Sequence, residues 1–224
     1  MNHATRINVA TVGTIFGLSG MTHGFAEALQ GNTPTGGWFI NAIAAGSSWT
    51  RWSEGGEGAF TIVPTFLATG ILAMLVGLAI IVWSLGFVQR RHGPTIYLLL
   101  FVLLFLVGGG IGQVLFFIPA WLVATRIHAP LTWWRSALPV GLQHGLARAW
   151  PWLLAVAATL ILTALVIATF GYIPSIADME RVMNITLTMV GASLLSFLLA
   201  FVAGFAADIT RGERRVGQFV GSVQ

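Results

Sequence analysis

The sequence predicts an all-α fold, an integral membrane bundle of about five transmembrane helices with two interfacial or re-entrant segments, in a single domain. Hydrophobic residues make up 56% of the 224-residue chain and charged residues only 8%, whereas soluble domains carry about 25% charged residues. Apolar stretches long enough to cross a bilayer, about 20 residues each, recur along the chain. Arginines stand at the ends of these stretches, as they do beside membrane spans.

Five stretches are predicted to span the membrane, at about residues 7–29, 60–88, 95–123, 152–173 and 184–209. The first is long, carries two ionisable residues and has no clean cleavage site, so we interpret it as a retained helix rather than a signal peptide. The long connections 30–59 and 124–151 are rich in tryptophan. We expect them to lie at the headgroup level, with a dip back into the membrane as the alternative.

An odd number of spans places the two termini on opposite sides of the membrane. The eleven basic residues, all of them arginines, then divide seven to four in favour of the side that carries the C-terminus, which predicts an outside N-terminus and an inside C-terminus. Abundant alanine, glycine, arginine and tryptophan, with no lysine, is typical of a GC-rich bacterial genome. The predicted location is therefore a bacterial inner membrane, with membrane lipid as a partner and no nucleic acid.

Small residues at helical spacing predict close helix packing, which is what holds helices together in lipid. In the first span they form one face, made of Gly13, Gly17, Gly20 and Gly24. This glycine face could pack within the bundle, or it could bind a second copy of the chain or a partner membrane subunit. The third span instead has a dense cluster, Gly108, Gly109, Gly110 and Gly112, which predicts a helix break because each glycine costs up to about 1 kcal/mol in a helix.

Ionisable residues inside a membrane span are by default candidates for function. His23 and Glu27 lie four residues apart on one face of the first span, and Glu27 continues the glycine face. Under the five-span topology, other polar residues gather on the same side. The predicted ligand or proton site comprises His23, Glu27, Gln113, His144, Arg148 and Asp208, with Arg148 or Arg126 as the counter-charge of Glu27.

Three functions remain open for this site. The first is a small transport or ligand-binding protein in which Glu27 titrates and His23 assists it. The second is an accessory subunit without chemistry, in which Glu27 forms a structural ion pair. The third is a membrane enzyme in which His23 and Glu27 hold a metal ion together with His128, His144 or Asp208. The sequence names no cofactor and no catalytic motif, so an enzyme is the least favoured of the three.

Several cofactor and nucleophile chemistries are excluded by composition. The chain has no cysteine, which rules out thiolate catalysis, iron–sulfur clusters and disulfides. It also has no lysine, which rules out a retinal Schiff base. The glycine cluster Gly108–Gly112 lies in an apolar run without the lysine of a nucleotide-binding loop.

Overall fold

The computed structural model describes residues 1–43 and 58–221, with side chains as far as Glu213 near the C-terminal end. This part of the chain forms seven helices and two short strands, which confirms the predicted all-α bundle. The helices are α1 (His3–Leu29), α2 (Phe66–Gly86), α3 (Gly93–Leu106), α4 (Val114–Ala124), α5 (Thr132–Ala137), α6 (Val140–Phe170) and α7 (Met179–Gly221). The strands are β1 (Phe39–Asn41) and β2 (Gly58–Phe60), which pair antiparallel.

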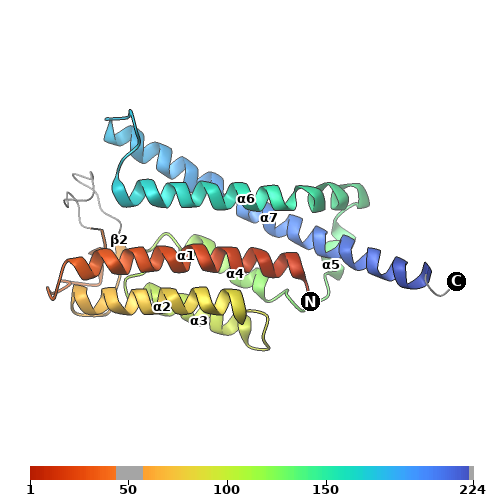
Figure 1. Ribbon diagram of the computed structural model, residues 1–224, viewed down its shortest axis with the longest axis horizontal. Helices are drawn as coiled ribbons and strands as arrows, with labels where there is room; N and C mark the ends of the chain where they lie inside the picture. The colour runs from red at the N-terminus through yellow and green to blue at the C-terminus, as the bar shows by residue number, and fades with distance from the viewer. Residues whose placement is uncertain (44–57, 222–224) are drawn as a thin grey trace.

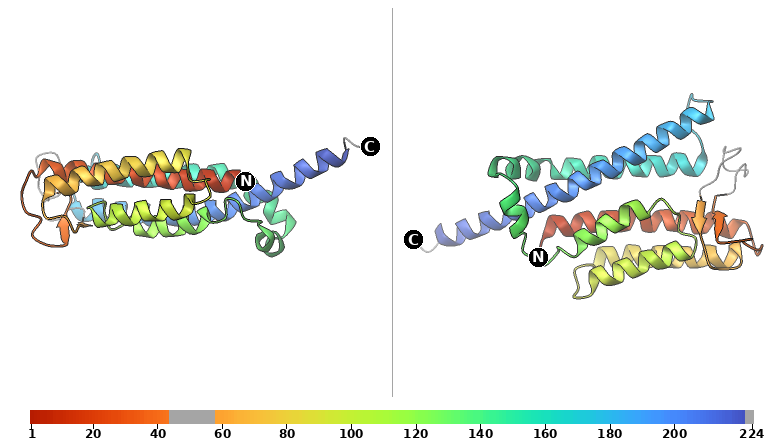
Figure 2. Two further views of the ribbon diagram at one scale, coloured as in Figure 1. Left: turned by 90° about the horizontal axis from the view of Figure 1, so that it is seen from below. Right: turned by 180° about the vertical axis from the view of Figure 1, so that it is seen from behind.

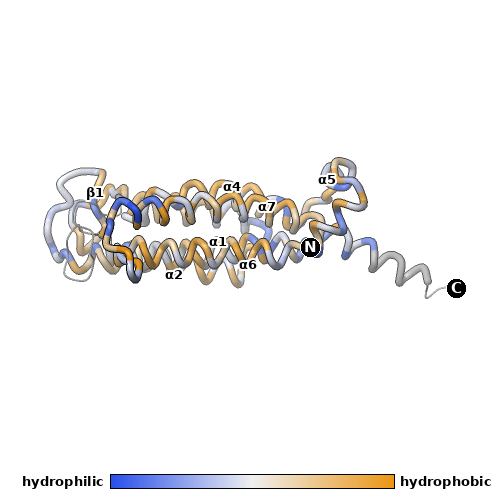
Figure 3. The backbone as a smooth tube through the Cα atoms, turned by 90° about the horizontal axis from the view of Figure 1, so that it is seen from above, coloured by the Kyte–Doolittle hydropathy of each residue, from blue (hydrophilic) through white to orange (hydrophobic). Residues whose placement is uncertain are grey.

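The long helices form two layers, with α1 in the middle of one layer between α2 and α6 and the other layer made of α3, α4 and α7 (Figures 1 and 3). Hydrophobic residues follow the helices and hydrophilic ones gather at the two ends (Figure 3). Among the described residues, α2, α6 and α7 are long and apolar enough to cross a membrane, and α3 and α4 are shorter apolar helices. Helix α1 has the length but is less apolar, because protein rather than lipid surrounds it.

The glycine face of α1 packs against α2 of the same chain. A side-chain Cβ at Gly24 would lie 2.5 Å from the carbonyl oxygen of Gly70, and one at Gly77 would lie 2.5 Å from that of Gly17. At Gly20 an added Cβ would meet the side chain of Leu104 in α3. The backbones of α1 and α2 therefore touch along their length, and the glycine face is buried inside the bundle.

The prediction of a single membrane crossing over residues 95–123 is wrong, although the helix breaks at the predicted glycine cluster. Helix α3 ends at Leu106, α4 begins at Val114, and α4 runs back antiparallel to α3 (Figure 1). The glycine cluster lies in the connection, whose backbone pairs with the strands: the amide of Gly108 donates to the Phe60 carbonyl oxygen at 3.0 Å. The broken stretch is thus a hairpin of two helices, and it returns the chain to the end from which it came.

This hairpin puts both termini at the same end of the bundle, contrary to the five-span topology (Figure 1). We call it the amino end; there the Asn2 amide donates to the Ile127 carbonyl oxygen at 2.7 Å, and the ring Nε2 of His128 lies 2.7 Å from the carbonyl oxygen of Gln89. The opposite end carries β1 and β2, and we call it the strand end. Helix α1 runs from the amino end to the strand end, and α7 runs the other way.

The described parts of the two long connections hold little helix. The described part of 30–59 holds β1, β2 and turns, and the remainder, residues 44–57, lies outside the described residues. In 124–151 a helix of six residues, α5, lies at the amino end, and α6 already begins at Val140. The predicted fourth span is therefore part of a helix of 31 residues that begins within the connection predicted to lie at the headgroup level.

Helices α6 and α7 form a second hairpin, which contacts the rest of the bundle mainly near the amino end. The Asn8 side chain of α1 donates to the Ala200 carbonyl oxygen of α7 at 2.9 Å and accepts from the indole N–H of Trp150 in α6, also at 2.9 Å. Toward the strand end, α7 diverges from α1, whereas α6 stays parallel to it (Figure 2, right). This divergence opens the space in which the candidate site lies.

Candidate functional site

The two ionisable residues predicted in the first span lie in the last two turns of α1, at the strand end. The side chain of Glu27 is fully buried, and His23 is 5% exposed. Neither carboxylate oxygen of Glu27 has a hydrogen-bond partner among the described residues. A buried carboxylate without donors is unusual, because removing its hydration is compensated only by hydrogen bonds or an opposite charge.

The connection between α3 and α4 covers both side chains. A Cβ at Gly108 would overlap the carboxylate of Glu27, and one at Gly110 would lie 2.9 Å from Cε1 of the His23 ring. Both glycines also have positive φ angles, 100° and 90°, which other residues rarely adopt. Glycine is needed here for two reasons, since only it takes up this backbone conformation and leaves room for the two side chains.

Gln113, the third residue of the predicted site, fixes this connection. Its side chain is 4% exposed, and its Nε2 donates to the carbonyl oxygens of Gly109 at 2.7 Å and Gly110 at 3.0 Å. Its Oε1 is buried and accepts no hydrogen bond from the described residues. The structure therefore brings His23, Glu27 and Gln113 together around the glycine cluster.

Two threonines that we did not predict from the sequence hold the other side of the connection. The hydroxyl of Thr69 donates to the carbonyl oxygen of Val107 at 2.7 Å and lies 2.7 Å from the hydroxyl of Thr61. Both side chains are buried. They satisfy a carbonyl group that the end of α3 leaves free. The only sign of these contacts in the sequence is that both threonines are isolated in apolar surroundings. Such a hydroxyl more often donates to a carbonyl oxygen of its own helix, so the sequence does not predict the contact.

A cleft lies beside His23, between α1 and the α6–α7 hairpin. Its volume is about 470 Å³, and it is lined by the glycine connection, by Gln113 and by apolar side chains such as Phe116 and Leu165. A second hollow of about 270 Å³ lies between α1 and α6, and His23 lines it as well. The first volume falls within the range of small-molecule sites. His23 thus lines both hollows, and Glu27 lines neither.

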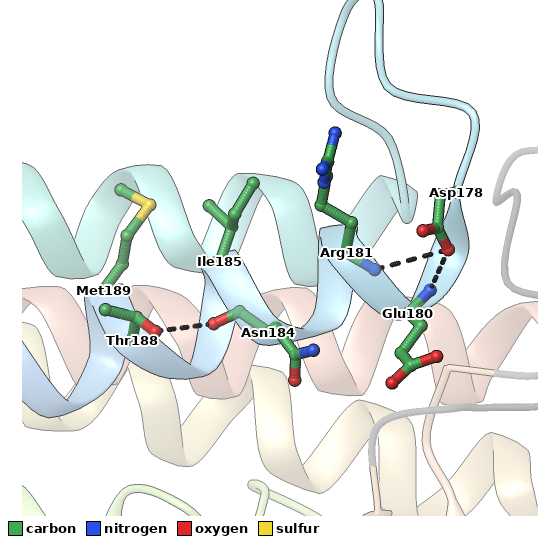
Figure 4. Close-up of a pocket in the computed structure, with 7 residues that line it drawn as sticks. All are labelled: Asp178, Glu180, Arg181, Asn184, Ile185, Thr188 and Met189. Atoms are coloured by element: carbon green, nitrogen blue, oxygen red, sulfur yellow. Dashed lines mark hydrogen bonds between the residues drawn. The ribbon is translucent and has the colours of Figure 1, made fainter.

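A further hollow of about 500 Å³ lies at the start of α7 (Figure 4). Its lining comes from successive turns of one helix and from the residue that caps it, Asp178, whose carboxylate accepts from the amide of Glu180 at 3.0 Å. Glu180 and Asn184 point to one side of the helix and Arg181 to the other (Figure 4). This is a shallow depression on an exposed helix face and does not involve Glu27.

Three residues predicted to belong to the site lie elsewhere. Asp208 of α7 lies at the amino end, where it accepts hydrogen bonds from the amides of Ala4 and Thr5 at 2.8 and 2.9 Å. His144 and Arg148 are exposed in the first turns of α6, also at the amino end. The predicted pairing of Glu27 with Arg148 or Arg126 is therefore wrong, because these partners are at opposite ends of the bundle. The error follows from reading the third span as one crossing.

The predicted metal site gains no third ligand. In the part of the chain that the structure describes, no group of three histidine or acidic side chains lies close enough to hold an ion. His128 and His144, which could have completed the shell, lie at the amino end with Asp208.

Comparison of the chain with protein-family models, characterised proteins and solved structures finds no match.

Proposed function

We propose that the chain, whose three long apolar helices fit a membrane protein, is a small transport or ligand-binding protein in which Glu27 takes up and releases a proton. The observation that carries the proposal is the fully buried carboxyl group of Glu27, which no described residue hydrogen-bonds. Intramembrane carboxyl groups that exchange protons are a recurring device of pumps and transporters.

The surroundings of Glu27 favour its neutral form in this conformation. An ionised carboxylate that is buried without hydrogen-bond donors costs several kcal/mol. No described residue donates to the carboxylate of Glu27, and the side chain packs against the backbone of Gly108. Ionisation therefore requires a second conformation, in which water, a cation or a donor reaches the carboxylate. Neutralisation of Glu27 and closure of the glycine connection over it are coupled in this proposal.

His23 supplies the route between Glu27 and the cleft. It lies one helical turn from Glu27 on the same face of α1, and it lines both hollows between α1 and α6. An imidazole can accept a proton at one nitrogen and donate from the other. A ligand that enters the 470 Å³ cleft would therefore contact His23 and the edge of Gln113 before it could affect Glu27.

The proton on Glu27 can be tested without knowing the ligand. Infrared spectra of the purified protein at neutral pH should show the carbonyl stretch of a protonated carboxyl group, and Glu27→Gln should abolish it. The matched control is Asp178→Asn, which changes an exposed carboxylate and should leave the band unchanged. An identical band in Glu27→Gln would reject the proposal.

Transport is tested separately in proteoliposomes that contain a pH-sensitive dye. A potassium diffusion potential should drive proton uptake through the parent protein, and uptake should fall at least tenfold in Glu27→Gln. Equal uptake in the two proteins would reject Glu27 as the carrier. An infrared band without proton flux in either protein would favour a binding or accessory subunit over a transporter.

A further inference from the structure

The arginines of the chain are distributed very unevenly between the two ends of the bundle. Nine of the eleven belong to the amino end by their position along the helices and connections; they are Arg6, Arg90, Arg91, Arg126, Arg135, Arg148, Arg211, Arg214 and Arg215. Of the described residues, only Arg181 is an arginine at the strand end, and Arg51 lies outside the described residues. This division results from the hairpin of α3 and α4. If residues 95–123 crossed the membrane once, as the five-span topology has it, the eleven arginines would divide seven to four between the two sides.

The arginines at the amino end have few acidic neighbours. Asp208 directs both carboxylate oxygens to the start of α1. Glu213 lies 3.7 Å from Arg135, in an exposed pair of the kind that contributes little. Arg90, Arg91 and Arg126 are all exposed. The described acidic residues of the strand end are Asp178 and Glu180 at the start of α7, together with the buried Glu27.

Tryptophans are exposed at the amino end, as is Trp38 at the strand end, so both ends fit a membrane interface. Trp133 of α5 is 66% exposed and Trp152 of α6 is 74% exposed. Exposed tryptophan beside arginine is typical of the headgroup level, where the ring remains in a partly apolar layer and the guanidinium reaches phosphate. Arginine also matches phosphate geometrically, because its planar guanidinium can donate two parallel hydrogen bonds.

We propose that the amino end lies on the cytoplasmic side of the membrane and that its arginines bind the headgroups of anionic phospholipids. The connections that carry Arg90, Arg91, Arg126 and Arg135 are short, and arginines in short loops determine orientation. Anionic lipid gives the cytoplasmic leaflet a negative surface potential, which attracts basic residues near it. The predicted orientation, N-terminus outside and C-terminus inside, is replaced by one with both termini inside. Glu27 then lies toward the opposite face.

The orientation is tested by cysteine labelling, for which the chain is suited because it has no cysteine of its own. Ser136→Cys places a thiol at an exposed position of α5, and Asn32→Cys places one at an exposed position of the strand end. In intact bacterial cells that express the protein, a membrane-impermeant maleimide should label Asn32→Cys and should label Ser136→Cys only after permeabilisation. The reverse pattern, or equal labelling of both, would overturn the proposal.

Lipid binding is tested with the full chain in detergent. We expect fluorescent phosphatidylglycerol to bind more tightly than fluorescent phosphatidylcholine, and high salt to reduce the difference. Each arginine contributes about fivefold to such binding, so the triple variant Arg90→Gln, Arg91→Gln, Arg126→Gln should bind phosphatidylglycerol about a hundredfold more weakly. Arg181→Gln at the strand end is the control and should change nothing. Equal affinity for the two lipids, or an equal loss in the control, would overturn the proposal.

Discussion

Asp208 joins the last helix to the first, and its replacement provides a direct test of the fold. Its carboxylate accepts from the amides of Ala4 and Thr5 and, at 2.7 Å, from the hydroxyl of Thr5. Both Ala4 and Thr5 are fully buried. The carboxylate therefore caps the N-terminus of α1, although Asp208 lies near the other end of the sequence. Its negative charge also faces the positive end of the helix dipole.

The size of the effect follows from what Asp208→Ala would leave behind. A lost cap costs about 0.5 to 2 kcal/mol, and a buried donor left without a partner costs about 1 to 3 kcal/mol. Two amides become unpaired, so we expect a loss of about 2 to 4 kcal/mol in the free energy of unfolding. In a chain of this size 1 kcal/mol lowers the melting temperature by about 2 to 4 °C, which gives a decrease of roughly 4 to 16 °C. Asp208→Asn keeps one oxygen acceptor and should fall between the parent and the alanine variant.

The assay is thermal unfolding in detergent, followed by circular dichroism, with Asp178→Ala as the matched control. Asp178 also accepts from backbone amides at the start of a helix, those of Glu180 and Arg181, but it does so at an exposed site where water can replace it. The control should lower the melting temperature by no more than about 2 to 4 °C, the equivalent of about 1 kcal/mol. If Asp208→Ala melts with the parent, or no lower than the control, the contact between α7 and α1 is not as described.

Two further predictions concern the packing of α1. Gly24→Ala should lower the free energy of unfolding by about 1 to 3 kcal/mol, because the added methyl group would lie 2.5 Å from the Gly70 carbonyl oxygen. The control is Gly86→Ala, whose added methyl group would have nothing within 4 Å. It should be neutral or slightly stabilising in the same melting assay. Asn8→Ala should lower stability by about 1 to 3 kcal/mol, because it removes the hydrogen-bond acceptor of the Trp150 indole. A red or blue shift in the tryptophan fluorescence should accompany the loss, and an unchanged spectrum would argue against the contact.

Most of the helices could be predicted from the sequence because apolar length is a local property. The small-residue faces could be predicted as well: the spacing of Gly13, Gly17, Gly20 and Gly24 required a close neighbour, and α2 supplies it with Gly70 and Gly77. What could not be predicted was the identity of that neighbour. The same face would have served a second copy of the chain equally well.

The reversal at the glycine cluster could not be predicted, because several glycines in a row weaken a helix equally whether the chain bends or turns back. Whether the chain bends or reverses depends on contacts with residues far away in the sequence, such as the hydrogen bond from the Gly108 amide to the Phe60 carbonyl oxygen. One wrong crossing then misplaced everything after it. His23, Glu27 and Gln113 come before or at the turn and lie together in the structure, whereas His144, Arg148 and Asp208 come after it and lie at the other end of the bundle.

The contact between Asp208 and the start of α1 also has a consequence for synthesis of the chain. The two partners are separated by 204 residues, and at about 5 to 20 residues per second the ribosome needs roughly 10 to 40 s to make that length. During this interval the first helix is already available for insertion, but the residue that completes its first turn does not yet exist. The early bundle of α1 and α2 must therefore persist with the amides of Ala4 and Thr5 unpaired until the last helix is made. In a nascent chain arrested before Asp208, the start of α1 would be exposed to a chaperone or protease.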